Sequence, residues 1–468
     1  MSTESQEFDF VVIGGGSAGY AGASLAARLG LKVALVEGSR EVGGLCILGG
    51  CMPSKTLIQS ANRFATLRRA KEFGLRAENI SVRGEEIMER KRRLVGEFAA
   101  CRRKQLESGR FALIQGVGKF VDPHTLEVAG EKTSRLRAKS FLIATGSSIK
   151  IVDIPGLKET GFLDSNGVLA AAHIPKSVIM LGAGPVALEF AHYYSALGSE
   201  VTILQRGLQV LRNTDGDVAT AVSDALCSRG VNLFLGTTLT RVEKSAAGKR
   251  VFFQCEGAEH SVEAEEIVYG LGRSPNIGTL GLEAAGVTVQ HGRLPTTLKQ
   301  QTNVPHIFAA GDAAGPHEIV HIAIQQAEIA VRNATRLVRG SAEPLEETDF
   351  RLKLFVAFTE PQVATVGFTE RELISANAPY VVARYPFADL GKAEVIGETD
   401  GFVKLIASAG KCEILGAAAV GPEASELIHE LAAAMYFHAT AHDLLQIPHY
   451  HPTLSEIWTY PAEELVMP

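Results

Sequence analysis

The chain has 468 residues, of which 46% are hydrophobic and 21% charged, and its formal net charge is −6. These values exclude a disordered chain and a coiled coil, and the acidic balance argues against a nucleic-acid-binding protein. The length predicts roughly three domains, and six cysteines are too few for a disulfide scaffold. Residues 1–9 lack a signal-peptide pattern, and no apolar run approaches the ~20 residues that a membrane helix requires. We therefore expect a cytoplasmic enzyme with no membrane or nucleic-acid partner.

The first part of the chain predicts a strand, a glycine turn, a helix and a second strand. The apolar runs are Phe8 to Ile13 and Lys32 to Val36, and the small-residue stretch Tyr20 to Leu29 lies between them. The turn fits GxGxxG, which lets backbone N–H groups and the positive end of a helix meet a pyrophosphate. Its glycines are Gly14, Gly16 and Gly19. Glu37, 23 residues beyond Gly14, is placed to bind a ribose hydroxyl.

A glycine-rich segment follows, in which residues 43–55 read GGLCILGGCMPSK and Cys46 and Cys51 lie five residues apart. A zinc site needs about four ligands, and no second Cys/His pair has a suitable spacing. A redox pair instead needs a thiolate beside an electron carrier and a second thiol for the substrate. We therefore favour a redox pair over a metal half-site or two unreactive core cysteines.

Two stretches with helical spacing come next, Thr56 to Leu75 and Glu85 to Glu107. The second stretch carries basic runs at 90–93 and 102–104. A docking face for an acidic partner is one interpretation of these runs. The apolar stripe on the same stretch favours a solvated helix face.

A second strand–turn–helix–strand unit begins with the strand Ser177 to Leu181 and ends with the strand Glu200 to Leu204. Its turn reads GxGxxA, from Gly182 through Gly184 to Ala187, with a helix to Leu197. Two such units predict two dinucleotide-binding domains. Where an NAD site offers a carboxylate after the second strand, this chain has Gln205 and Arg206, with Arg212 beyond them. These residues favour the 2′-phosphate of NADPH over NADH, unless the arginines are ordinary surface charges.

From about Glu346 the pattern changes to short strands, at Phe358 to Phe368, Gly401 to Ala407 and Ile414 to Val420, followed by an Ala-rich helix, Ala424 to Ala439. This order predicts an α+β module without nucleotide turns.

Several further segments carry a family resemblance. They are LIATGS (142–147), GLGRSPN (270–276), TNVPHIFAAGD (302–312) and HPTLSE (451–456). Together with GGLCILGGCMPSK, they make nearly the whole chain resemble the class I pyridine nucleotide-disulfide oxidoreductases, which include dihydrolipoamide dehydrogenase, glutathione reductase and mercuric reductase. The resemblance implies an α/β fold with two Rossmann-like dinucleotide-binding domains, for FAD and NAD(P), and a C-terminal α+β dimerisation domain. The implied limits are 1–150 for the first FAD part, 151–274 for the NAD(P) domain, 275–345 for the second FAD part and 346–468 for the dimerisation domain.

The resemblance also implies roles for the catalytic residues. Cys51 would be the flavin-proximal thiolate and Cys46 the thiol that attacks the substrate. Lys55 would lie near the flavin and pair with Glu189. A general acid–base histidine, oriented by a carboxylate, would act on the cysteines of the other subunit of a homodimer. These last two residues are His451 and Glu456, although T-L-S-E at 453–456 is also a capping box.

Further residues are implied to bind the cofactors. The FAD set would be Gly14, Gly16, Ser17, Gly19, Glu37, Gly44, Lys55, Gly118, Thr145, Gly146, Ser147, Asp312 and His321. The NAD(P) set would be Gly182, Gly184, Val186, Gln205, Arg206, Arg212 and Gly272. Within the FAD set, Glu37 would contact the adenosine ribose, Gly118 the adenine end and Asp312 the ribityl chain. No metal ligands are implied.

The expected activity is an FAD-dependent NAD(P)H:disulfide oxidoreductase acting on a small-molecule or lipoyl disulfide. Ser24 replaces the arginine that glutathione reductases carry in the first helix, and Pro185 replaces their nicotinamide-gating tyrosine. The ending PAEELVMP lacks the cysteine pair of mercuric reductases. Two alternatives stay open: oxidation of lipoyl dithiols with NAD, and a flavin-binding redox sensor or diaphorase without disulfide turnover.

Overall fold

The computed structural model describes residues 5–246 and 248–467, which divide into two compact units. The first unit comprises Met1–Pro53, Arg90–Lys150 and Gly272–Asp349, and the second comprises Ser54–Glu89, Ile151–Leu271 and Phe350–Pro468. The domain limits expected from the sequence stay a prediction. Within the described ranges, no helix combines the length and the apolarity required to cross a membrane.

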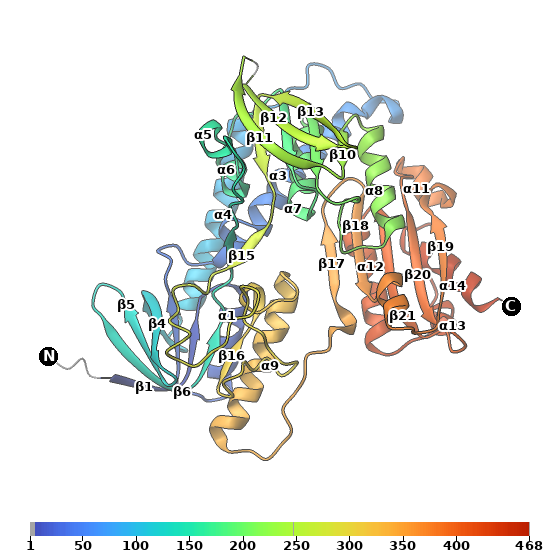
Figure 1. The fold of residues 1–468 in the computed structure, drawn as a ribbon. Coiled ribbons are helices and arrows are strands. Elements are labelled where there is room, and N and C mark those ends of the chain that lie inside the picture. Colours follow the sequence, from blue (N-terminus) through green and yellow to red (C-terminus); the bar gives the residue numbers. More distant parts are fainter. Residues whose placement is uncertain (1–4, 247, 468) are drawn as a thin grey trace. The chain divides into compact units, whose positions relative to one another are not determined.

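The first unit is built on a mainly parallel sheet with the strand order β3-β2-β1-β6-β5-β4, and β16 pairs with the far half of β6 (Figure 1). β4, β5 and the near half of β6 form the antiparallel part. The strands are β1 (Ser5–Ile13), β2 (Val33–Glu37), β3 (Ala112–Gln115), β4 (Val117–Asp122), β5 (Thr125–Ala129), β6 (Ser134–Ile143) and β16 (Ile307–Ala309). A separate pair joins β7 (Ser147–Ile149) to β15 (Arg273–Pro275).

The carboxyl-terminal part of β1, residues 10–13, is apolar without a break. Successive side chains of a strand point to opposite faces, and here both faces are covered. Val11 and Ile13 belong to one buried cluster, whereas Phe10 and Val12 belong to another. Helices α1 (Ser17–Arg28) and α9 (Val320–Arg339) pack against each other and supply residues to the second cluster. β1 is therefore fixed between two buried clusters, and the glycine turn follows directly after its carboxyl end.

The helices around the cysteines start and stop differently from the prediction. α2 (Gly44–Leu48) and α3 (Cys51–Arg68) come first, and a short 3-10 helix, Ala70–Phe73, follows α3. The predicted helix Thr56 to Leu75 thus begins earlier and ends earlier. Its early start is compatible with Pro53, because the first turn of a helix does not need the N–H that proline lacks. α4 (Gly84–Leu106) matches the predicted Glu85 to Glu107 closely.

The second unit contains a parallel sheet, β10-β9-β8-β14, an antiparallel sheet, β11-β12-β13, and a C-terminal antiparallel sheet, β17-β18-β21-β20-β19. The predicted strand Ser177 to Leu181 is confirmed as β8. The first two sheets and their helices are α5 (Leu157–Thr160), α6 (Ser165–Ala170), β8 (Ser177–Leu181), α7 (Pro185–Ala196), β9 (Glu200–Gln205), α8 (Gly216–Ser228), β10 (Asn232–Leu235), β11 (Thr238–Ser245), β12 (Gly248–Cys255), β13 (Ala258–Ala264) and β14 (Glu266–Tyr269).

The C-terminal sheet is buried on both faces. On β18, Val363 packs into a cluster with helix α7, whereas Ala364 and Val366 pack beneath α12. Its elements are β17 (Leu354–Ala357), β18 (Gln362–Gly367), α10 (Glu370–Ser375), β19 (Tyr380–Pro386), α11 (Gly391–Ile396), β20 (Phe402–Ser408), β21 (Ile414–Gly421), α12 (Ala424–Tyr436), α13 (Ala441–Gln446) and α14 (Thr459–Val466).

Two C-terminal predictions need correction. The single strand Phe358 to Phe368 is wrong, because residues 358–361 form the connection between β17 and β18 and Pro361 cannot donate a ladder hydrogen bond. The Ala-rich helix ends at Tyr436, three residues early. His438 there has a φ of +55°, which a right-handed helix cannot contain.

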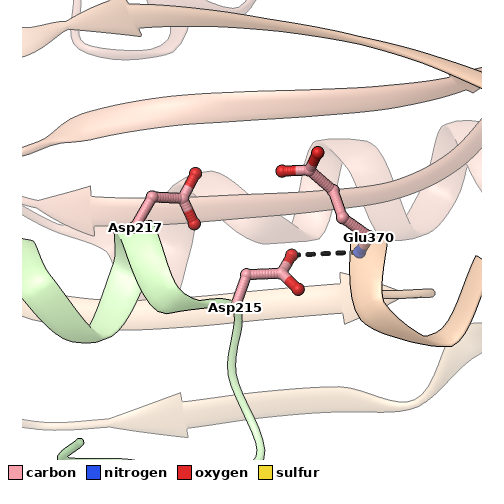
Figure 2. A group of neighbouring side chains, drawn as sticks. All are labelled: Asp215, Asp217 and Glu370. Atoms are coloured by element: carbon pink, nitrogen blue, oxygen red, sulfur yellow. Dashed lines mark hydrogen bonds between the residues drawn. The ribbon is translucent and has the colours of Figure 1, made fainter. Parts of the chain in front are cut away.

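Lys404 of β20 is completely buried and holds three carboxylates within the second unit. Its Nζ donates to Asp215 at 2.7 Å, Asp217 at 2.8 Å and Glu370 at 3.1 Å. Figure 2 shows the carboxylates of Asp217 and Glu370 facing one another, with Asp215 bonded to the backbone N–H of Glu370. The three acids could geometrically surround a cation, but the Lys404 ammonium contacts all of them. The cluster is therefore a buried ion network joining α8, α10 and β20.

Lys404→Met should lower the thermal unfolding midpoint. The substitution keeps the volume but removes one of the two cations that the described residues place against these partly buried carboxylates, the other being Arg384, and we expect it to cost roughly 2–4 kcal/mol. Lys411→Met, at an exposed lysine on the following turn, removes the same charge and serves as the control. Equal midpoints for the two variants would contradict the network's stabilising role.

Candidate redox and dinucleotide sites

The first glycine turn connects β1 to α1 and leaves no room for side chains. Gly14 has a φ of +104°, and a Cβ atom there would lie 2.4 Å from the carbonyl oxygen of Ala144. A Cβ atom on Gly19 would lie 1.8 Å from the carbonyl oxygen of Gly14. Gly16 is the N-cap of α1 and has no side chain to cover the first N–H groups of the helix. The turn thus keeps the helix end available to a pyrophosphate, as FAD binding requires.

Glu37, the last residue of β2, is buried against this turn. Its carboxylate accepts hydrogen bonds from the backbone N–H of Gly15 at 2.8 Å and of Ser39 at 2.7 Å. A charge held by two N–H donors fixes the turn relative to the second strand. The ribose contact assigned to Glu37 stays a prediction.

The cysteine segment is attached to the same turn. Gly44 has a φ of +67°, and a Cβ atom on it would lie 2.5 Å from Cα of Gly16. Cys46 lies within α2, which Gly44 begins, and Cys51 begins α3. Both cysteines are half-buried. The backbone contact therefore sets the cysteines close behind the proposed pyrophosphate site in sequence and in space.

Three of the segments that carry the family resemblance meet at Ser147. Its hydroxyl donates to Asp312 at 2.6 Å and accepts from Nε of Arg273 at 2.8 Å. Arg273 also donates to the backbone carbonyl of Ser147 at 2.7 Å, and Asn276 donates to that of Thr145 at 3.1 Å. Arg273 and Asn276 were missing from the predicted set, although GLGRSPN contains both. The predicted Ser147 and Asp312 are thus in direct contact.

The remaining FAD residues lie at separate points of the first unit. Ser17 is the first residue of α1, and Gly146 has a φ of +68° with open space where a Cβ would stand. Gly118 lies in β4, where a Cβ atom would be 2.9 Å from the side chain of Leu126. His321 is exposed in the first turn of α9. Their assigned cofactor contacts stay predictions.

The second glycine turn connects β8 to α7. Gly182 has a φ of +96°, and a Cβ atom there would lie 2.8 Å from the carbonyl oxygen of Gly270. Gly184, the N-cap of α7, faces open space, and Val186 is exposed in the first turn. The geometry again suits a pyrophosphate at a helix N-terminus. Gly272 belongs to the first unit, so its assigned contribution to this site stays a prediction.

Gln205, the last residue of β9, places a neutral amide beside this turn. The side-chain oxygen of Gln205 accepts from the N–H of Ala183 at 3.3 Å, and its amide nitrogen donates to the carbonyl of Gln209 at 3.1 Å. An amide can satisfy both partners, whereas a carboxylate could satisfy only the N–H. Arg206 and Arg212 are exposed.

Lys55 and Glu189 form the predicted ion pair, with both carboxylate oxygens 2.8 Å from Nζ. Two contacts with Phe358 were not foreseen from the sequence. Its backbone N–H donates to Glu189 at 3.1 Å, and its ring lies 4.7 Å from Nζ of Lys55. One helical turn after Glu189, buried His192 bonds to Asn62 of α3 at 2.6 Å, and burial lowers the pKa of His192 to about 4. α3 and α7 are therefore tied together twice.

His451 and Glu456 are also in contact. Nδ1 of His451 lies 2.8 Å from one oxygen of Glu456, and the other oxygen accepts from the N–H of Thr453 at 3.2 Å. The expected capping box is half realised, because Glu456 caps Thr453 while the Thr453 hydroxyl bonds to Ser455. The His451 side chain is 79% exposed and that of Glu456 only 11% exposed. A buried carboxylate thus orients an imidazole whose other nitrogen is available.

The comparisons with known proteins agree with this geometry. The family described as pyridine nucleotide-disulphide oxidoreductase matches residues 8–327, and its dimerisation domain matches residues 355–462. A dihydrolipoyl dehydrogenase of Chlamydia muridarum is 34% identical over 98% of this chain and 97% of its own, and one of Bacillus subtilis is 32% identical over 96% of both.

Among solved structures, LpdA from Mycobacterium tuberculosis is 27% identical with a TM-score of 0.87, covering 98% of this chain and 100% of its own. The HOCl-induced flavoprotein disulfide reductase RclA from Escherichia coli, in a Cu(II) complex, is 26% identical with a TM-score of 0.84 over the same shares. The fold class expected from the sequence is confirmed. The chain therefore belongs to the pyridine nucleotide-disulphide oxidoreductase family, as a flavoprotein disulfide oxidoreductase similar to dihydrolipoyl dehydrogenases.

Proposed function

We propose that this protein is a homodimeric enzyme that uses NADPH to reduce a disulfide substrate through FAD and the Cys46–Cys51 pair. The observation that carries the proposal is the contact of Gly44 with Gly16, because it fixes the cysteine segment to the turn that suits the flavin pyrophosphate. Bound FAD would supply two-electron transfer between the nicotinamide and the cysteine pair. NADH is the second choice of nucleotide.

The chain's own residues then perform thiol–disulfide exchange. The Cys46 thiolate attacks one sulfur of the substrate, whose S–S bond breaks as a mixed disulfide forms, and the departing thiolate takes a proton from His451. Cys51 next attacks the Cys46 sulfur, which restores the Cys46–Cys51 disulfide and expels the second substrate thiolate, and this thiolate takes its proton from solvent. The substrate gains two electrons and two protons, and the two cysteines lose two electrons.

His451 would act from the partner subunit, with Glu456 stabilising its protonated form. The exposure of His451 in a single chain supports this arrangement, since a catalytic imidazole needs a site to face. Neighbouring apolar residues are exposed as well, with Tyr450 at 81% and Phe437 at 77%. Such a patch is typical of a covered interface, in keeping with the dimerisation domain.

Oxidation of lipoyl dithiols with NAD is the second candidate, because the similar proteins of Chlamydia muridarum and Bacillus subtilis are named dihydrolipoyl dehydrogenases. Gln205 argues against it, because a carboxylate at this position would favour the free ribose hydroxyls of NAD. A flavin-binding sensor or diaphorase is the third candidate. Such a protein does not need an acid–base group for thiols, so it would not explain the His451–Glu456 pair.

Cys46→Ser should lower the rate of disulfide reduction on the order of a thousandfold or more, while NADPH still reduces and bleaches the flavin. The reason is that the serine cannot form the mixed disulfide, although the nicotinamide and flavin sites are untouched. Stopped-flow absorbance and steady-state turnover with a disulfide panel measure the two steps. Cys227→Ser, at an exposed cysteine of α8, is the control. Full disulfide turnover by Cys46→Ser would reject the mechanism.

Gln205→Glu should reverse the nucleotide preference, lowering the ratio of kcat/KM for NADPH to that for NADH by roughly tenfold or more. The new carboxylate would repel a 2′-phosphate and accept hydrogen bonds from ribose hydroxyls. Gln254→Glu, on the exposed side of β12, adds the same charge as a control. A wild-type enzyme that prefers NADH would overturn the nucleotide assignment.

Gly44→Ala should reduce the flavin content of the purified protein. The added methyl group would meet Cα of Gly16 at 2.5 Å, and neither backbone segment can give way without moving the turn. Flavin absorbance relative to protein measures the loss. Gly96→Ala is the matched control, because this glycine lies inside α4 with open space around it and should gain about 0.5–1 kcal/mol in stability. Normal flavin content in Gly44→Ala would place the flavin elsewhere.

A further inference from the structure

One arginine of α4 is not on the solvated face to which the sequence assigned it. Arg102 is half-buried, and its Cζ lies 3.9 Å from the ring centroid of Tyr20 on α1. Arg110 donates to the hydroxyl of the same tyrosine at 3.2 Å, which fixes the other edge of the ring. Burial raises the pKa of Tyr20, but hydrogen bonds with Arg110 and Ser24 and the positive charges of Arg110 and Arg102 hold it below the ordinary value. Arg103, the next residue, is exposed as predicted.

The guanidinium of Arg102 retains an unused donor. Its Nη1 is buried and has no hydrogen-bond partner among the residues that the structure describes. A buried donor on a charged group is expensive to leave unsatisfied, so such a group usually meets a ligand, a water or an ion. The stacking on Tyr20 holds the guanidinium plane but uses none of its N–H groups.

A series of contacts links Arg102 to the segment that carries Cys46. Arg102 lies on Tyr20, which is one helical turn after Gly16 on α1. Gly16 in turn contacts Gly44, and Cys46 follows Gly44 by two residues. Burial lowers the pKa of Arg102, and Tyr20, Cys101 and Cys46 each act to raise it, so Cys46 lies within electrostatic range of the guanidinium. Both groups belong to the same compact unit.

We propose that Arg102 is a specificity-determining residue that binds a carboxylate of the disulfide substrate beside Cys46. A guanidinium matches a carboxylate with parallel hydrogen bonds, and Tyr20 and Arg110 hold it in place for this purpose. The substrate class is therefore a small disulfide carrying a carboxylate close to its sulfur atoms, rather than a neutral one. The inference rests on the proposed role of Cys46 as the exchange thiol.

The first test compares two alkylating reagents that differ in charge. Holoenzyme reduced with a phosphine and desalted anaerobically reacts with iodoacetate or iodoacetamide, and mass spectrometry follows the Cys46 peptide. In the wild type, Arg102 should favour the anionic reagent. Arg102→Met should lower the ratio of the two rates by roughly fivefold to tenfold, whereas Arg103→Met should leave it unchanged. Cys227 in the same samples reports the intrinsic ratio of the reagents.

The ratio separates anion binding from thiol activation, because both reagents attack the same thiolate and its fraction cancels. Arg102→Lys keeps the positive charge but cannot form two parallel hydrogen bonds with a carboxylate. Its ratio of iodoacetate to iodoacetamide rates should therefore fall between those of the wild type and Arg102→Met. An unchanged ratio in Arg102→Met, with flavin content equal to the wild type, would overturn the proposal. If Arg102→Met loses its flavin, the ratio of the two alkylation rates is measured on Arg102→Lys instead.

The second test uses turnover. Dithiobis(2-nitrobenzoate) carries carboxylates on its rings, and dithiodipyridine is a neutral aromatic disulfide. Arg102→Met should lower kcat/KM for the first by roughly tenfold relative to the second. Equal losses for both would overturn the proposal. Absence of turnover with every disulfide would reject the proposed function instead, and the alkylation ratio would still decide the role of Arg102.

Discussion

A contact between two glycine backbones underlies the arrangement of the first unit. Gly44 and Gly16 approach so closely that a single methyl group on Gly44 would collide with the chain. Glycine is the residue that permits both this approach and the positive φ of Gly44. The contact joins the start of α1, where the backbone suits a pyrophosphate, to the start of α2, where the first cysteine lies. Local chain geometry therefore couples cofactor binding to thiol position without any long side chain between them.

Charged side chains perform the complementary task of joining segments distant in the sequence. Lys55 connects α3 to α7, Lys404 connects β20 to the start of α8, and Arg273 connects β15 to Ser147. In each case the cation is at least partly removed from water and meets several acceptors. Removing Lys55 or Lys404 leaves carboxylates without a counter-charge in a poorly solvated place, and removing Arg273 leaves a hydroxyl and a carbonyl without their donors.

The sequence predicts those parts that depend on local spacing. Both glycine turns follow from residues that must avoid a Cβ atom, and β8 follows from an apolar run bounded by a turn. The contacts of Phe358 with Lys55 and Glu189 could not be predicted, because about 170 residues separate the ring from its acidic partner. Lys404 was equally hidden, since a single lysine in an apolar strand gives no sign of where its acids lie.

Arg102 shows the same limit most clearly. Helical periodicity counts it with Arg103 and Lys104 as a basic run, but periodicity cannot show what a residue at the edge of the polar face stacks upon. Its partner Tyr20 lies one turn before Ser24 on α1, the position at which glutathione reductases carry their arginine. The guanidinium absent at position 24 of α1 is thus supplied against the same helix by α4. An anionic substrate is attracted by a positive charge near its binding site, whichever helix carries that charge. Ser24 by itself therefore excludes no anionic substrate, and α4 helps to determine which substrate charge is accepted.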